Sequence, residues 1–128
     1  MNRIVLDASA ILAVILPEPG HEKLTGELLS KAVCSTVNLA EVQAKLVSRG
    51  WPSDDAWHDA ASPVRELVPF DAEQAKTSGD LITVTRSLGL SLGDRACLAL
   101  AIAFDAPVYT TDKNWKKLRL GVPIHVLR

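Results

Sequence analysis

Short runs of apolar residues alternate along this sequence with longer segments that carry helix signals. The first run, at residues 3–6, contains Ile4-Val5-Leu6, and further runs follow at residues 32–34, 64–70, 107–110 and 123–127. A short continuous apolar run is typical of a strand buried on both faces. Strands that alternate with helices predict an α/β fold with a parallel, doubly wound sheet of about five strands, flanked by helices.

The segments between the apolar runs predict the helices of this fold. Ser9 is a candidate cap for a helix over residues 10–16, and either Ser35 or Thr36 can cap a helix that runs to Arg49. Asp71 is expected to start a long helix ending near Gly89. We also expect an amphipathic helix over residues 21–31 with its leucines inward, a short helix that opens at residues 52–55, and a central, Ala-rich helix over residues 94–104.

The length and composition predict one globular domain over residues 1–128, without a linker or repeat. The longest apolar run, Ala96–Phe104, is too short to span a bilayer, and the first residues lack the pattern of a signal peptide. Cys34 and Cys97 stand alone in apolar surroundings and are expected to be reduced core thiols. We therefore expect a cytoplasmic protein.

Four carboxylates are expected to converge at the carboxyl ends of the strands. Asp7 directly follows the first strand, Asp112 follows the fourth, Asp94 opens a helix, and Glu41 lies within a helix. In such sheets, sites form beyond the carboxyl ends of the strands. Like charges about 4 Å apart repel by roughly 4 kcal/mol at an effective dielectric constant near 20, so a cluster of acids has to bind protons or a cation.

An all-oxygen site of this kind suits Mg²⁺ or Mn²⁺, whereas zinc prefers histidine and cysteine. The three histidines, His21, His58 and His125, do not have the spacing of metal ligands. Each acid could also have a purely structural role. Asp7 and Asp94 could cap helices and Asp112 could sit in a turn. Glu41 could form an ion pair with Lys45, four residues further along the helix. The joint placement of all four acids at one sheet edge favours a metal site.

Several motifs resemble those of the PIN-domain ribonucleases, and most closely those of VapC-type toxins of bacterial toxin–antitoxin pairs. They are V-L-D-A-S-A at residues 5–10, N-L-A-E-V at 38–42, L-S-L-G-D-R-A-C-L-A-L-A at 90–101 and V-Y-T-T-D-K-N-W at 108–115. They occur in the family's order, and the resemblance covers essentially the whole chain. It implies a PIN-like three-layer sandwich with strand order 3-2-1-4-5. It also implies a divalent-metal-dependent endoribonuclease that forms a homodimer and binds an antitoxin protein over its site.

The resemblance also implies roles for individual residues. The family's catalytic acids fall on Asp7, Glu41, Asp94 and Asp112. Among these, we expect Asp7 and Asp94 to be direct metal ligands, with Asp112 completing the ligand set and Glu41 positioning water or a second ion. The family's small hydroxyl positions fall on Ser9 and Thr111, which would orient carboxylates by hydrogen bonds.

The charge distribution suggests where an RNA backbone would bind. Residues 1–80 contain 7 lysines and arginines against 12 acids, whereas residues 81–128 contain 7 against 3. Such asymmetry can mark an anionic partner. The candidate phosphate contacts are Arg86, Arg95, Lys113, Lys116, Lys117 and Arg119, and packing or partner contacts are expected for Trp51, Trp57 and Trp115.

Two other classes of function are alternatives. One is a phosphotransfer module, receiver-like or dehalogenase-like, with Asp7 as phospho-acceptor; the dehalogenase-like pattern needs a second Asp where this chain has Ser9, and a receiver would have no use for Glu41. The other is a PIN fold that binds RNA or protein without cleaving it. Labelling of Asp7 as an acyl phosphate would favour the first, and RNA affinity without metal-dependent cleavage the second.

Overall fold

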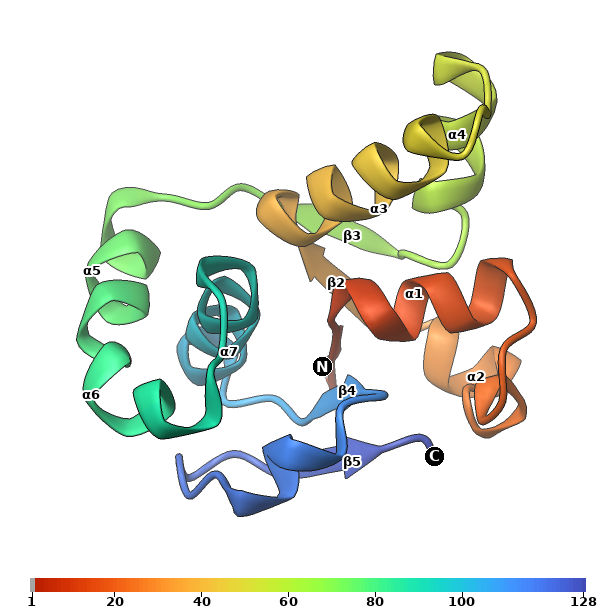
Figure 1. Cartoon of the computed structure of the whole chain (residues 1–128). Coiled ribbons are helices and arrows are strands. Elements are labelled where there is room, and N and C mark those ends of the chain that lie inside the picture. Colours follow the sequence, from red (N-terminus) through yellow and green to blue (C-terminus); the bar gives the residue numbers. More distant parts are fainter. Residues whose placement is uncertain (1) are drawn as a thin grey trace.

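Five short parallel strands form the centre of the molecule in the computed structural model, which describes residues 2–128 (Figure 1). The strands follow the order β3-β2-β1-β4-β5, and every neighbouring pair is parallel. This confirms the predicted fold class and strand order. The strands are β1 (Ile4–Leu6), β2 (Ala32–Ser35), β3 (Glu66–Val68), β4 (Val108–Thr110) and β5 (Ile124–Val126).

Helices cover both faces of the sheet and produce two separate cores. Side chains of a strand alternate between faces, so Ile4 and Leu6 join one core and Val5 joins the other. The core with Ile4 and Leu6 lies under α1 (Ala8–Ile15), α3 (Thr36–Ser48) and α4 (Ser53–Ala61), with the short α2 (Gly26–Leu29) beside it. The second core lies under α5 (Ala72–Asp80), α6 (Ile82–Thr85) and α7 (Leu92–Phe104), on the left of Figure 1.

The Ala-rich helix α7 is buried along most of its length, as predicted for a central helix. Ala96, Ala99 and Ala101 are almost completely inaccessible, and α7 packs on α5, α3 and the sheet. Cys34 and Cys97 are both buried free thiols, as expected. Within the described residues, no helix is long and apolar enough to cross a membrane.

Two of the predicted helices are broken. Residues 21–31 contain the 3-10 turn η1 (His21–Lys23) and then α2, because the Thr25 side chain caps a new helix by accepting from the Leu28 amide at 3.3 Å. Residues 71–89 form α5, α6 and the 3-10 turn η2 (Arg86–Leu88) in place of one long helix. The Thr85 hydroxyl bonds back to the Leu81 carbonyl at 2.8 Å, a pattern that competes with helix continuation.

The helix starts were predicted more closely. Ser35 caps α3 through a bond from the Val37 amide at 3.2 Å, and Asp71 caps α5. The cap of α1, however, is Asp7 and not Ser9. A further 3-10 turn, η3 (Lys113–Lys117), was not predicted, and it follows directly on Asp112.

The register of the sheet brings Asp7 beside the end of β4. Val5 lies opposite Val108 and Leu6 opposite Tyr109, and the Asp7 amide then donates to the Tyr109 carbonyl at 3.2 Å. The residue that comes next on β4 is Thr110. Continuing this register by one position therefore places Thr110 next to Asp7 at the carboxyl edge of the sheet.

Candidate active site

Asp7 is the most buried of the four predicted acids, with an exposed fraction of 5%. Its Oδ1 accepts from the Ser9 hydroxyl at 2.7 Å and from the Ala10 amide at 2.8 Å, and its Oδ2 accepts from the Thr110 hydroxyl at 2.6 Å. Burial raises the pKa of Asp7 to about 6, although the hydrogen bonds from Thr110, Ala10 and Ser9 oppose the shift, and the charge of Asp94 adds to it. A nearby cation would remove this penalty on the ionised form.

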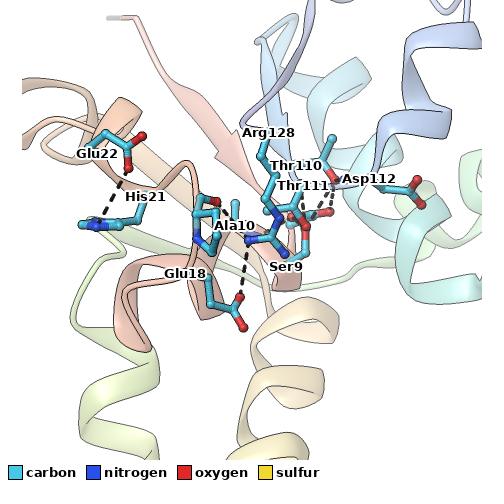
Figure 2. Close-up of polar contacts among 11 residues, drawn as sticks. Ser9, Ala10, Glu18, His21, Glu22, Thr110, Thr111, Asp112 and Arg128 are labelled. Carbon is cyan, nitrogen blue, oxygen red and sulfur yellow. Dashed lines mark hydrogen bonds and ion pairs between the residues drawn. The ribbon is translucent and has the colours of Figure 1, made fainter.

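Hydroxyl groups link Asp7 to the end of β4 and the segment after it, and Figure 2 shows Ser9 beside Thr110 and Thr111. The Thr110 hydroxyl donates to Asp7 and accepts from the Asp112 amide at 3.1 Å. The Ser9 hydroxyl donates to Asp7 and accepts from the Thr111 amide at 3.0 Å. Ser9 thus contacts a carboxylate as predicted, whereas Thr111 takes part through its backbone, and the hydroxyl that reaches Asp7 belongs to Thr110.

Asp94 and Asp112 both lie where a short segment turns into a helix. Asp94 forms a capping box with Ser91: its Oδ2 accepts from the Ser91 amide at 2.9 Å, and the Ser91 hydroxyl accepts from the Asp94 amide at 3.2 Å. Asp112 caps η3 by accepting from the Asn114 amide at 2.9 Å. Asp7 and Asp112 are therefore N-caps, and Asp94 is the capping-box partner of the N-cap Ser91. These bonds fix the three carboxylates at the edge of the site.

Glu41 reaches the site from α3 and is not a cap. Its Oε1 accepts from the Asn38 side-chain amide at 2.9 Å, and the same amide donates to the Gly93 carbonyl at 2.9 Å. Asn38 is almost fully buried, with 1% of its surface exposed, while Glu41 is exposed. No ion pair within 4 Å joins Glu41 to Lys45 among the described residues.

One cavity of about 390 Å³ brings all four acids together. Its wall also contains one basic residue, Lys45, one turn along α3 from Glu41. Burial raises the pKa of the Cys97 thiol, and the charges of Asp7, Cys34, Asp94 and Glu41 raise it further. Burial likewise raises the pKa of the Cys34 thiol to about 12. The lining residues are Asp7, Ala8, Ser9, Leu12, Glu41, Lys45, Asp94 and Asp112.

The donor set of this cavity fits a hard divalent cation. Carboxylate and hydroxyl oxygens line it, and neither a histidine nor a cysteine does. Within residues 2–128, no three acidic, imidazole or thiol groups lie close enough to hold one ion together. Mg²⁺ usually keeps several waters and is held by one or two carboxylates, so the carboxylate oxygens of this cavity are ligands of the kind that it takes.

The predicted phosphate-binding residues lie in different surroundings. Lys113, Lys116 and Lys117 are exposed on η3, next to Asp112. Arg95 instead packs toward α5, where its Nη1 donates to the Ser78 carbonyl at 3.1 Å. Arg86 is exposed on η2, and Arg119 donates to the carbonyls of Lys116 and Leu118.

The tryptophans and histidines take other positions. Trp115 is fully buried in the second core and Trp51 packs against the first, while Trp57 is 45% exposed. His125 stacks on Tyr109 with ring centroids 4.7 Å apart. The remaining two histidines lie beside acidic neighbours, His21 near Glu22 and His58 near Asp59.

Sequence reasoning missed four residues of the site: Asn38, Lys45, Gly93 and Thr110. The spacing of Asn38, Glu41 and Lys45 places them on one face of a helix, which is a signal that the sequence does contain. Thr110 meets Asp7 because of the register between β1 and β4, and Gly93 meets Glu41 because α3 packs on α7. Neither feature can be read from local sequence.

The sequence over residues 4–120 matches the PIN domain family. A search of curated proteins found no match. Among solved structures, VapBC2 from Rickettsia felis, bound to a promoter DNA fragment, has a chain that is 23% identical, with a TM-score of 0.73 and 98% of both chains covered. DNA-bound VapBC from Salmonella typhimurium has a chain at 15% identity and a TM-score of 0.75, with both chains fully covered.

A third similar structure is VapC20 from Mycobacterium tuberculosis, described as a toxin that cleaves the sarcin-ricin loop. It is 17% identical, with a TM-score of 0.73, and the alignment covers 94% of this chain and 98% of that one. At these identities the likeness concerns the fold.

Proposed function

The chain belongs to the PIN domain family, and we propose that it is a metal-dependent endoribonuclease that acts as the growth-inhibiting toxin of a toxin–antitoxin pair. The observation that carries this proposal is the convergence of Asp7, Glu41, Asp94 and Asp112 on one cavity at the carboxyl edge of the sheet. The structural likeness to VapC-type proteins supports the toxin part of the proposal.

Asp7 and Asp94 would hold the cation, with Asp112 completing the ligand set directly or through water. When bound, a divalent ion such as Mg²⁺ or Mn²⁺ supplies positive charge for the scissile phosphate and makes a nucleophile available from water at neutral pH. Glu41 would orient the attacking water or hold a second ion. No side chain has to form a covalent bond with RNA.

The neighbouring side chains fix the carboxylates and meet the substrate. The hydroxyls of Ser9 and Thr110 hold the two oxygens of Asp7 in place. Lys45, the one cation in the cavity wall, is positioned to contact a phosphate there. The lysines of η3 extend the contact along the RNA backbone, which is how a single strand is commonly tracked.

We propose a cognate antitoxin as the second partner. An acidic cavity attracts an Arg or Lys side chain from a partner segment, which would both neutralise the carboxylates and block the RNA. The solved structures of similar fold include complexes described as toxin–antitoxin systems. We further propose that the chain acts as a homodimer in the cytoplasm, where its RNA substrates are found.

The test is cleavage of single-stranded RNA with and without divalent metal, for the wild type and Asp7→Asn. We expect cleavage by the wild type with Mg²⁺ or Mn²⁺, none with a chelator, and none by the variant. RNA binding without cleavage would instead support a non-catalytic binding module. An acyl phosphate on Asp7 would support the phosphotransfer alternative.

The toxin role has its own experiment, which is expression in a bacterial host. The chain alone should arrest growth, and co-expression with a small neighbouring gene should relieve the arrest. Asp7→Asn, expressed at the same level, is the matched control and should be harmless. Unchanged growth with soluble wild-type protein would contradict the toxin role but not the nuclease.

A further inference from the structure

Glu41 differs from the other three acids because no helix cap fixes its position. Asp7, Asp94 and Asp112 each accept a backbone amide of their own helix end. Glu41 is exposed and depends on contacts with other residues for its orientation. One such contact is the hydrogen bond from the Asn38 side-chain amide, and the other is the close approach to Gly93 in the first turn of α7.

We propose that Asn38 and Gly93 position the Glu41 carboxylate, Asn38 as its hydrogen-bond donor and Gly93 by leaving the space that the carboxylate occupies. The proposal rests on the proposed function, in which Glu41 orients water or an ion. Asn38 and Gly93 act through Glu41 and are not expected to touch the RNA or the metal ion, so both are positioning residues.

The side chain of Asn38 links two helices, α3 and α7. Its side-chain amide donates to Glu41 Oε1, one turn along α3, and to the Gly93 carbonyl on α7, 55 residues away, both at 2.9 Å. The side chain is 99% buried, and its own carbonyl oxygen has no hydrogen-bond partner within the described residues. Leaving a buried polar atom unpaired is costly, so the gain from this residue lies in the two bonds that its amide donates.

Gly93 is required at its position by space and not by backbone conformation. A Cβ placed there would overlap the Glu41 carboxylate, with its carboxyl carbon and Oε1 each only 2.5 Å away. The carboxylate therefore lies against the bare Cα of Gly93. Gly93 is in the first turn of α7, at the positive end of the helix dipole, which also favours a carboxylate there.

A methyl group at residue 93 would therefore move the Glu41 carboxylate and little else. The atoms in its way are the far end of a flexible, exposed side chain that can swing into solvent. Alanine also has a higher helix propensity than glycine. Gly93→Ala should thus keep the fold while displacing one carboxylate of the site, which separates positioning from stability.

The experiment compares Gly93→Ala and Asn38→Leu with Gly79→Ala as a matched control. Gly79 lies in α5 with nothing within 4 Å of an added Cβ, so its substitution adds the same methyl group away from the site. Asn38→Leu keeps the approximate shape of the side chain and removes its donor. The readouts are the side-chain amide signal of Asn38 by NMR in the metal-free protein, Mn²⁺ affinity, and RNA cleavage.

We expect Gly93→Ala to shift the Asn38 amide signal as Glu41→Ala does, and Gly79→Ala to leave it unchanged. Gly93→Ala and Asn38→Leu should each weaken Mn²⁺ binding or cleavage by about tenfold or more, the scale found for residues that orient metal ligands. In a Glu41→Gln background, adding either substitution should cause no further loss, because both act through Glu41.

An Asn38 amide signal that Gly93→Ala leaves unchanged, together with wild-type Mn²⁺ affinity and cleavage, would overturn the proposal. Full additivity with Glu41→Gln would do so as well. If the wild type neither bound Mn²⁺ nor cleaved RNA, the proposed function would fail. The NMR comparison would then still decide whether Asn38 and Gly93 hold Glu41 in place.

Discussion

At the amino ends of the strands, the Arg3 guanidinium lies 4.4 Å from the centre of the Phe104 ring, and its Nε is 3.5 Å from Glu66 Oε1. Those charges are opposite and open to water, with side chains 39% and 49% exposed. At the carboxyl ends, Asp7 is almost buried and shares a cavity with three further acids. The same sheet thus has a paired, hydrated charge at one end. At the other end the buried Asp7 lies among three more exposed acids, and none of the four forms an ion pair within the described residues.

This difference indicates which end carries the function. Exposed ion pairs contribute little to stability, about 0–1 kcal/mol, and need no further explanation. A buried carboxylate next to other acids destabilises the metal-free fold, so its presence calls for a ligand. Substitutions at the carboxyl end of the sheet should therefore have larger effects than a substitution at the amino end.

Replacing Asp7 by Asn should stabilise the metal-free protein at pH 8. Because burial raises the pKa of Asp7 to about 6, its ionisation destabilises the folded state. The contribution of Asp7 to stability is complete below pH about 4 and is lost as the pH rises through about 6. Asp7→Asn should therefore gain about 1–3 kcal/mol at pH 8 and almost nothing at pH 4, measured by denaturant unfolding. An equal difference at both pH values would contradict this cause.

Replacing Thr110 by Val should reduce cleavage by roughly 10–100-fold. Thr110 is fully buried, and Val has nearly the same shape but cannot donate to Asp7 or accept from the Asp112 amide. The fold should lose about 1–2 kcal/mol, because the part-buried Asp112 amide loses its acceptor and the buried Asp7 carboxylate loses a donor. Thr110→Ser keeps the hydroxyl and serves as the control. Equal cleavage by the Val and Ser variants would remove Thr110 from the site.

Neutralising Lys113, Lys116 and Lys117 together should weaken RNA binding without lowering stability, since all three side chains are exposed. For single strands, each lost phosphate contact should flatten the plot of log affinity against log salt by roughly 0.7. Affinity is measured at several salt concentrations with Asp7→Asn as the background, to prevent cleavage. An unchanged slope would make these lysines ordinary surface residues.

Replacing Glu66 by Gln should have the smallest effect. The pair with Arg3 is exposed at the amino end of the sheet, and its loss should change stability by less than about 1 kcal/mol. Cleavage should stay at the wild-type rate, which makes this variant the control for the acids at the other end. A clear loss of cleavage would show that the two ends are not independent.

Short apolar runs and strand–helix alternation are local signals, and they were sufficient for the α/β class, the parallel sheet and the edge at which the acids meet. The strand order was instead implied by the resemblance to the PIN-domain family. The sequence was insufficient for the hydroxyl that contacts Asp7: two threonines are adjacent, and the register of β4 against β1 decides that Thr110 and not Thr111 is the neighbour. The broken helix over residues 71–89 was missed because its amphipathic pattern continues through Thr85, whose hydroxyl returns to the Leu81 carbonyl.

The contact between Gly93 and the Glu41 carboxylate could not be predicted from the sequence either. A glycine at a helix start is usually explained by capping or by a turn, whereas here the reason is a carboxylate from another helix. Only the packing of α3 against α7 reveals that contact.

The most direct test of the metal site is anomalous diffraction from crystals soaked in Mn²⁺, with wild-type protein and Asp7→Asn treated alike. We predict an anomalous peak in the cavity, within coordination distance of the Asp7 and Asp94 carboxylates in the wild type, and a weaker or absent peak in the variant. A wild-type map without a peak in this cavity, in crystals where the cavity is open to solvent, would contradict the claim that these acids form a metal site.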